Sequence, residues 1–285
     1  MRLGAYVGGI GVLGPGLTDW PHAAAVLSGM MAYSPASTIL PAPAMLPAAE
    51  RRRTGRVVKL AMAVALEAAT RAAVDPAELA SVFTSSGGDG HNCHEICQAL
   101  TLPSREISPT RFSNSVHNAA AGYWSIATGG QQESNVLCAF DASFCAGLLE
   151  ALTQSVVDRA AVLLVGYDIE YPPPLHAKRP VPDAFGAAIV ITPDRRHNSQ
   201  FYIEAALGAS PAARMAESGL EALRRSIPAA RCLPLLERFA RADGGRSALD
   251  YLDGTRVIVD VTPCAHTPCA HTPCANTPCA HTPCA

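Results

Sequence analysis

Residues 136–165 read VLCAFDASFCAGLLEALTQSVVDRAAVLLV, and this stretch decides the fold. Apolar runs over Val136–Phe140 and Ala161–Val165 each have the length of a buried strand. The segment between them, Ala146–Val157, has the length and pattern of a helix. Strand, helix and strand in this order predict a βαβ unit, and therefore a protein of the α/β class.

The same alternation continues on both sides of this unit. A helix over Arg56–Ala73 is indicated by Val58, Met62, Ala65 and Ala69, which recur at steps of three and four. The sequence therefore predicts a mixed central sheet with helices on both faces. The other expected strands are Leu3–Val12, Ala80–Thr84, Gly186–Thr192, Phe201–Leu207 and Thr255–Val261, and the other expected helices are Ala119–Thr128, Glu217–Arg225 and Pro234–Ala242.

Composition and charge exclude several classes of function. The 285 residues are 49% hydrophobic and 16% charged, which is typical of a globular protein with a large core. The formal net charge is -2 and no basic stripe is present, so we expect no nucleic-acid partner. No apolar run approaches the roughly 18 residues of a membrane span, and Met1–Gly4 does not begin a signal peptide. We expect a cytoplasmic protein with reduced cysteines, because the body of the chain holds an odd number of them.

A repeat closes the sequence. Near-identical Thr-Pro-Cys-Ala-His pentads run from Thr262 to Ala285, with Asn276 in place of one histidine. A proline in every pentad forbids a continuous helix, and large apolar side chains are missing, so we expect residues 262–285 to be disordered. The folded domain is then expected to span residues 1–261. The cysteines and histidines of the repeat are candidate zinc ligands, but their spacing matches no closed structural zinc site.

Six stretches of the chain resemble β-ketoacyl synthases, and the resemblance covers about residues 1–205. It is closest to short, single-half thiolase-like members of that family, which stand beside aryl-polyene and related polyketide genes. The resemblance implies a thiolase-like fold. The six stretches are Gly8–Gly16, Arg53–Ala68, Thr84–Gly87, Phe112–Gly122, Asp141–Leu152 and Asp183–Val190.

The resemblance also implies where catalytic residues would lie. A condensing enzyme needs a thiolate that carries the acyl group, an oxyanion hole and two histidines that promote decarboxylation. Cys145 is near the position of the synthase nucleophile, in the first turn of the helix that follows a buried strand, where helix amides would lower its pKa. Alternatively, Cys145 is a packing residue. His117, with Asn118, enters a helix beside this segment and is a candidate to orient a thiol, or else a structural residue at a helix start capped by the 113–115 run.

The two histidines of a full synthase lie in the second half of its chain, and residues 205–260 here contain no histidine. Full decarboxylative condensation is therefore not expected. The resemblance implies a chain-length-factor-type partner of an active ketoacyl synthase, either as a heterodimer or paired with a copy of itself. No cofactor is expected, because acyl groups would arrive on the phosphopantetheine of an acyl carrier protein. The alternative is an acyltransferase, or residual synthase, that uses Cys145.

A third hypothesis concerns metal. Cys93 and Cys97 are expected to share a helix face, close to His91, His94 and Glu95. A second cysteine pair at a distance is missing, so we predict no metal site there, and we interpret this helix as one that lines an interface.

Overall fold

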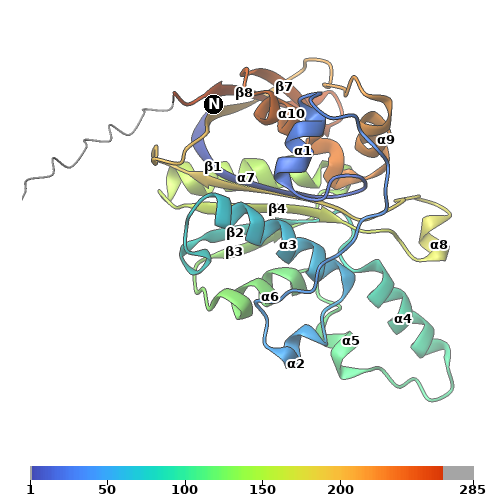
Figure 1. Ribbon diagram of the computed structural model, residues 1–285. Helices are drawn as coiled ribbons and strands as arrows, with labels where there is room; N and C mark the ends of the chain where they lie inside the picture. The colour runs from blue at the N-terminus through green and yellow to red at the C-terminus, as the bar shows by residue number, and fades with distance from the viewer. Residues whose placement is uncertain (1, 266–285) are drawn as a thin grey trace, which may run out of the picture.

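The computed structural model describes residues 2–265, which form one mixed sheet of eight strands with helices on both faces (Figure 1). The strands are β1 (Leu3–Leu13), β2 (Ala80–Thr84), β3 (Ser134–Leu137), β4 (Val162–Asp168), β5 (Phe185–Thr192), β6 (Phe201–Gly208), β7 (Gly245–Leu252) and β8 (Thr255–Pro263). The longer helices are α1 (Trp20–Leu27), α3 (Arg56–Arg71), α4 (Gly90–Thr101), α6 (Ala119–Thr128), α7 (Ser143–Val157), α9 (Ser218–Ser226) and α10 (Leu233–Arg241). The short helices are α2 (Ala48–Arg51), α5 (Pro109–Ser113) and α8 (Pro173–His176), with 3-10 turns η1 (Pro76–Glu78), η2 (Phe140–Ala142) and η3 (Pro228–Cys232).

The strands follow the order β3-β2-β4-β5-β1-β6-β8-β7 across the sheet. The first three are parallel, with Ser81 opposite both Ser134 and Leu163, and all other neighbours are antiparallel. Strands β2, β4 and β5 are buried along their whole length, because helices cover both of their faces. Parallel strands place their carboxyl ends at one edge, so the loops after β2, β3 and β4 meet there.

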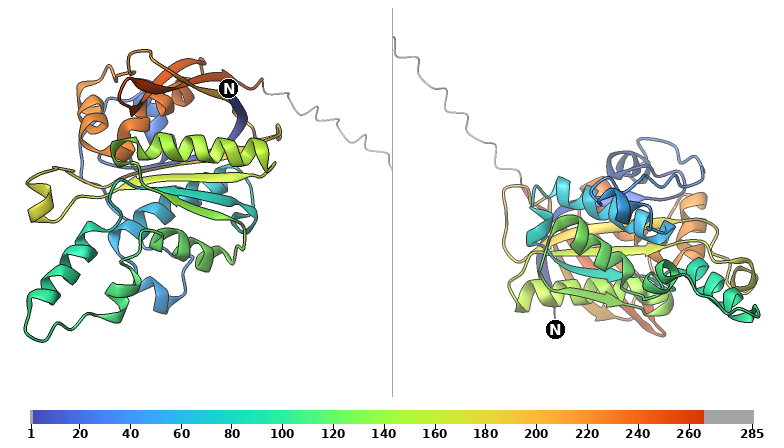
Figure 2. Two further views of the ribbon diagram at one scale, coloured as in Figure 1. Left: turned by 180° about the vertical axis from the view of Figure 1, so that it is seen from behind. Right: turned by 90° about the horizontal axis from the view of Figure 1, so that it is seen from below.

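Alternate residues of the central strands point into two separate cores. On one face, Phe83 and Leu163 pack with side chains of α3 and α6. On the other face, Val82 and Leu164 pack with α7, α10 and α1. Figure 2 shows α7 lying along this second face of the sheet in the view from behind.

The C-terminal strands extend the sheet beyond β1 and lie over the helices of the second core (Figure 1). Phe201 of β6 packs on Phe239 of α10, with ring centroids 4.9 Å apart. The helices α7 and α10 are therefore enclosed between the central strands and the β6-β8-β7 end. This arrangement explains why α7 carries so many buried residues on more than one side.

Most predicted elements are confirmed, and the predicted α/β architecture, a mixed central sheet with helices on both faces, is the observed one. The strand over Ala80–Thr84 and the helix over Ala119–Thr128 have the predicted bounds. The strand expected over Val136–Phe140 is instead Ser134–Leu137, because the chain turns sharply before Phe140. It is also an exposed edge strand, so the expectation of a buried strand before Cys145 is wrong.

Two of the longer elements, α1 and β7, were not expected from the sequence. Strand β7 forms a hairpin with β8, and α1 begins at a side-chain cap in which His22 N donates to Asp19 Oδ1 at 2.8 Å. Strand β8 runs to Pro263, opposite Phe201, so the first residues of the repeat belong to the sheet. The rest of the segment expected to be disordered, residues 266–285, lies outside the described residues.

An arm made of α4 and α5 projects from the body below the sheet (Figures 1 and 2). Asn92 is the one buried residue of α4 in this arm. No helix among residues 2–265 combines the length and the apolar character needed to cross a bilayer.

Candidate functional site at the carboxyl edge of the parallel strands

The turn between β3 and α7 holds the most unusual backbone at this edge. Phe140 has a φ of 52°, in the left-handed region that residues other than glycine rarely adopt. Ser143 fixes the turn, because its Oγ accepts from Ala139 N at 3.0 Å and donates to Phe140 O at 2.7 Å. A strained residue between a strand and a helix is the geometry in which α/β-hydrolases present a nucleophile. Here the residue in that elbow is a phenylalanine, 61% exposed.

Two arginines surround the elbow. The Arg179 guanidinium carbon lies 3.6 Å from the centroid of the Phe140 ring, which is a cation–π contact. Arg179 also pairs with Asp141, and Arg231 donates to the other oxygen of Asp141 at 2.8 Å. We call Phe140, Asp141, Arg179 and Arg231 the elbow cluster. It places an aromatic ring and a paired carboxylate, and no nucleophile, in the turn that leads into α7.

Cys145 is not part of the elbow cluster. It is the third residue of α7, is 2% exposed and packs in the second core. Burial raises the pKa of the Cys145 thiol well above its ordinary value, and the charge of Asp250 adds to the rise, while Arg231 opposes it. The expected lowering of the pKa by the helix amides is therefore wrong. A thiol in this state is a poor source of thiolate.

Cys138 is the thiol that the sequence analysis overlooked. It directly follows β3, is exposed, and its Sγ donates to Ser86 O at 3.3 Å. Because it falls inside the strand expected over Val136–Phe140, no local signal indicated that its thiol would be exposed. The structure thus holds one accessible thiol beside Phe140 and one inaccessible thiol on the helix.

The buried carboxylate of Asp168 connects three segments at this edge of the sheet. Asp168, at the end of β4, accepts from Ser86 N at 2.8 Å, Ser86 Oγ at 2.7 Å, Ser85 Oγ at 3.2 Å and Ala229 N at 2.8 Å. These bonds connect the loop after β2 to β4 and η3. Burial raises the pKa of Asp168 to about 6, although each of these hydrogen bonds lowers it.

His117 is not brought to Cys145. It precedes α6, which packs on the α3 face of the sheet, while Cys145 packs on the opposite face. Its Nε2 is buried and has no hydrogen-bond partner among the described residues, and its ring lies beside Gly88 in the loop after β2. The two candidate residues therefore do not form a catalytic pair in this structure.

The capping expected at the start of α6 is also wrong. Ser113 Oγ donates to Pro109 O at 3.0 Å and Ser115 Oγ donates to Phe112 O at 2.8 Å, so both serines serve the preceding turn. Asn114 Nδ2 donates to Arg53 O at 2.8 Å, and its Oδ1 accepts from the Tyr123 hydroxyl. The bond to Arg53 attaches the α5–α6 segment to the body of the protein, and the bond from Tyr123 ties Asn114 to α6.

Cys93 and Cys97 lie exposed on α4, on one helix face as expected. Burial and the neighbouring Cys97 raise the pKa of Cys93. Glu95 is paired with Arg111 at 3.3 Å. Within residues 2–265, no group of three His, Cys, Asp or Glu side chains is arranged to hold a metal ion.

The mixed sheet, its two helical layers and the strand-elbow-helix turn together define a thiolase-like α/β protein. The family model described as the β-ketoacyl synthase N-terminal domain matches residues 22–235, so the chain belongs to that family. No curated protein matches it.

Solved structures of similar fold include ketosynthases and chain length factors. A ketosynthase in complex with its chain length factor from Xenorhabdus doucetiae is 22% identical, with a TM-score of 0.68 over 90% of this chain and 99% of that chain. The ishigamide ketosynthase/chain length factor is 12% identical, with a TM-score of 0.68 over 92% and 100%. A type II polyketide synthase acyl carrier protein in complex with its ketosynthase is 10% identical, with a TM-score of 0.71 over 92% and 99%. These likenesses confirm the thiolase-like fold.

Proposed function

We propose that this chain is a non-condensing, chain-length-factor-type partner of an active ketoacyl synthase in fatty-acid or polyketide assembly. The observation that carries the proposal is the strained turn into α7, which holds the phenyl ring of Phe140 and not a nucleophile. A phenyl ring cannot carry an acyl group, and Cys145 nearby is buried with a raised pKa. The partner would therefore supply the chemistry.

The free edge of β3 supports pairing with another sheet. In the described part of the chain β3 has β2 as its one neighbour, so its outer backbone groups are open to a further strand. Helix α6 contacts β3, and the exposed side chains of Val116 and Ile126 lie before and within it. An exposed strand edge next to apolar side chains is the kind of surface that a homologous subunit, or a second copy of this chain, would cover.

Phe140 supplies a mechanism for this role. It lies three residues after the end of β3, and Arg179 packs on its exposed ring. In the proposed complex, the ring forms part of the wall that the growing acyl chain meets. A large rigid ring there limits the chain length, whereas a smaller side chain leaves room for further extension. The acyl carrier protein would bring its phosphopantetheine-bound substrate to the synthase.

Co-purification with a candidate ketosynthase tests this proposal. We expect the two chains to elute together and the products to become longer with Phe140→Ala. The control is Leu252→Ala, which removes an equally exposed apolar side chain from the β7–β8 hairpin and leaves product length unchanged. A synthase whose elution, activity and products are unaffected by this chain would refute the partner role.

An acyltransferase is the second candidate, and the exposed Cys138 beside the elbow is the observation that keeps it open. In that reaction a cysteine sulfur attacks the carrier thioester, a new thioester forms, and the carrier thiol leaves with the proton. Intact-protein mass spectrometry with an acyl-loaded carrier protein separates the possibilities. An adduct lost in Cys145→Ala supports the sequence-based assignment, one lost in Cys138→Ala assigns the elbow thiol, and no adduct supports the non-condensing partner.

A further inference from the structure

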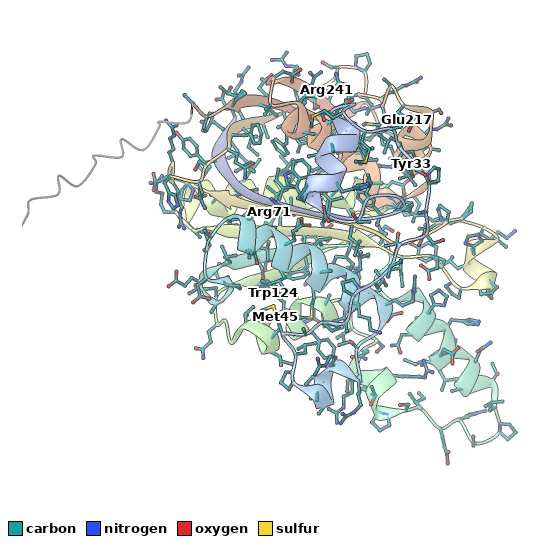
Figure 3. All side chains as sticks on the ribbon, in the orientation of Figure 1. Tyr33, Met45, Arg71, Trp124, Glu217 and Arg241 are labelled. Carbon is teal, nitrogen blue, oxygen red and sulfur yellow. The ribbon has the colours of Figure 1, made fainter. Side chains whose placement is uncertain are left out.

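The outer face of α3 carries a groove that the proposed function does not use. Its volume is about 490 Å³, within the range of small-molecule sites. One wall is the segment 39–45, which crosses α3 on its way to α2 (Figure 1), and the floor is formed by Met62, Ala63 and Leu66. We call this the α3 groove. Met45, labelled in Figure 3, belongs to the crossing segment.

The wall of the α3 groove is fixed at both ends. Before it, Thr38 N donates to Asp183 Oδ2 at 3.0 Å and Thr38 Oγ1 donates to Ala184 O at 2.7 Å. After it, Leu46 is buried and packs in a small core with Met62. Prolines at positions 41, 43 and 47 restrict the backbone between and beyond these anchors. The groove is therefore formed before any ligand arrives, which lowers the entropic cost of binding.

The charges of the α3 groove are unequal at its two ends. At one end Glu67 is already occupied, because its oxygens accept from Val12 N at 3.0 Å and Trp20 N at 2.7 Å and it pairs with Arg71. At the other end Lys59 is half-buried and has no ion-pair partner within residues 2–265. A positive charge that is partly desolvated beside an apolar channel attracts an anionic head group.

The distance between the ends sets the size of the ligand. Lys59 and Glu67 are eight residues apart on α3, which is about 12 Å along the helix axis. The surface between them is apolar, from Met62 to Leu66. We propose that the α3 groove binds a medium-chain fatty-acid anion, with the carboxylate on Lys59 and the hydrocarbon chain along Met62, Ala63 and Leu66. This site lies on α3 and is independent of the β3 edge and of Phe140.

Calorimetric titration of the full chain with decanoate, and with decanol as a ligand without charge, tests the proposal. We expect decanoate to bind at one site per chain. Lys59→Gln should weaken the binding of decanoate by about tenfold, which corresponds to the loss of one charge-assisted hydrogen bond. The affinity for decanol should not change. The matched control is Lys178→Gln, since Lys59 and Lys178 are the only lysines in the sequence and Lys178 lies just after α8.

A second variant tests the position of the chain. Ala63→Phe places a ring on the floor of the α3 groove and should abolish the binding of both ligands, while an unchanged circular dichroism spectrum shows that the fold is kept. Three results would overturn the proposal: no saturable decanoate binding, equal affinity in wild type and Lys59→Gln, or binding that survives Ala63→Phe. The last of these would place the lipid elsewhere on the protein.

Discussion

Asp168 should make the stability of this protein depend on pH in a measurable way. Its carboxyl group is fully buried among the hydroxyls of Ser85 and Ser86 and two backbone N–H groups. Burial raises its pKa from the ordinary 3.8 to about 6, so between these values the folded chain holds a proton that the unfolded chain has released. The stabilisation is complete below about pH 4 and is lost as the pH rises through 6. The rise in pKa corresponds to about 3 kcal/mol of unfolding free energy.

The assay is urea unfolding, followed by circular dichroism at a series of pH values from about 4 to 7 with a reducing agent present. Relative to Asp168→Asn, the wild type should lose about 3 kcal/mol of unfolding free energy over this range, because the variant has no proton to release. The control is Asp194→Asn, which removes an exposed carboxylate paired with Arg159. Its unfolding free energy should show the same dependence on pH as that of the wild type. Parallel curves for wild type and Asp168→Asn would refute the reasoning and show that the carboxyl group is solvated.

Three further predictions concern packing, thiol access and a buried ion pair. Gly147→Ala should destabilise the protein by about 1–3 kcal/mol, because the added Cβ would lie 2.9 Å from two side chains. Gly122→Ala should stabilise α6 by about 0.5–1 kcal/mol, because its Cβ would meet nothing within 4 Å. Thermal unfolding measures both changes. Alkylation mapped by mass spectrometry should modify Cys93 within the folded protein and Cys145 only on unfolding. Arg224→Leu should cost about 1–3 kcal/mol in urea unfolding, since it removes the ion-pair partner of Glu221 and one of the two partners of Asp250, which keeps Arg256.

Each of these has a result that would contradict it. Equal stability of the two alanine variants would mean that α7 can move away from the sheet. Fast alkylation of Cys145 in the folded state would show that its pocket opens, and would return it to consideration as a nucleophile. A loss below about 1 kcal/mol for Arg224→Leu would place that ion pair in effectively full solvent.

The strands and helices were largely predictable because their signals are local. The five residues of β2 are apolar or small and are followed by a serine-glycine turn, and α6 begins with three alanines. The missed elements also carried local signals. Asp19 followed by Trp20 and Pro21 is a helix start, and the pair Asp253-Gly254 is a hairpin turn that would have placed β7 against β8.

The candidate site was less predictable, because its features depend on segments far apart in the sequence. Cys145 was selected from its spacing to leucines, and that spacing does not say which face of α7 the core covers. The capping of α6 failed for a similar reason. Asn114 is instead hydrogen-bonded to Arg53 and Tyr123, and only folding brings these residues to it.

The sequence by itself determined the α/β class and most element bounds, because periodicity and turn residues act over a few positions along the chain. The family came from the resemblance of six stretches of the chain to β-ketoacyl synthases. It also determined that residues 205–260 hold no histidine. Only the tertiary structure decided that Phe140 and not a thiol occupies the elbow, that Cys145 is buried, and that a groove lies over α3. Backbone strain, burial and cavity shape are set by contacts between distant segments, and these exist only once the sheet has assembled.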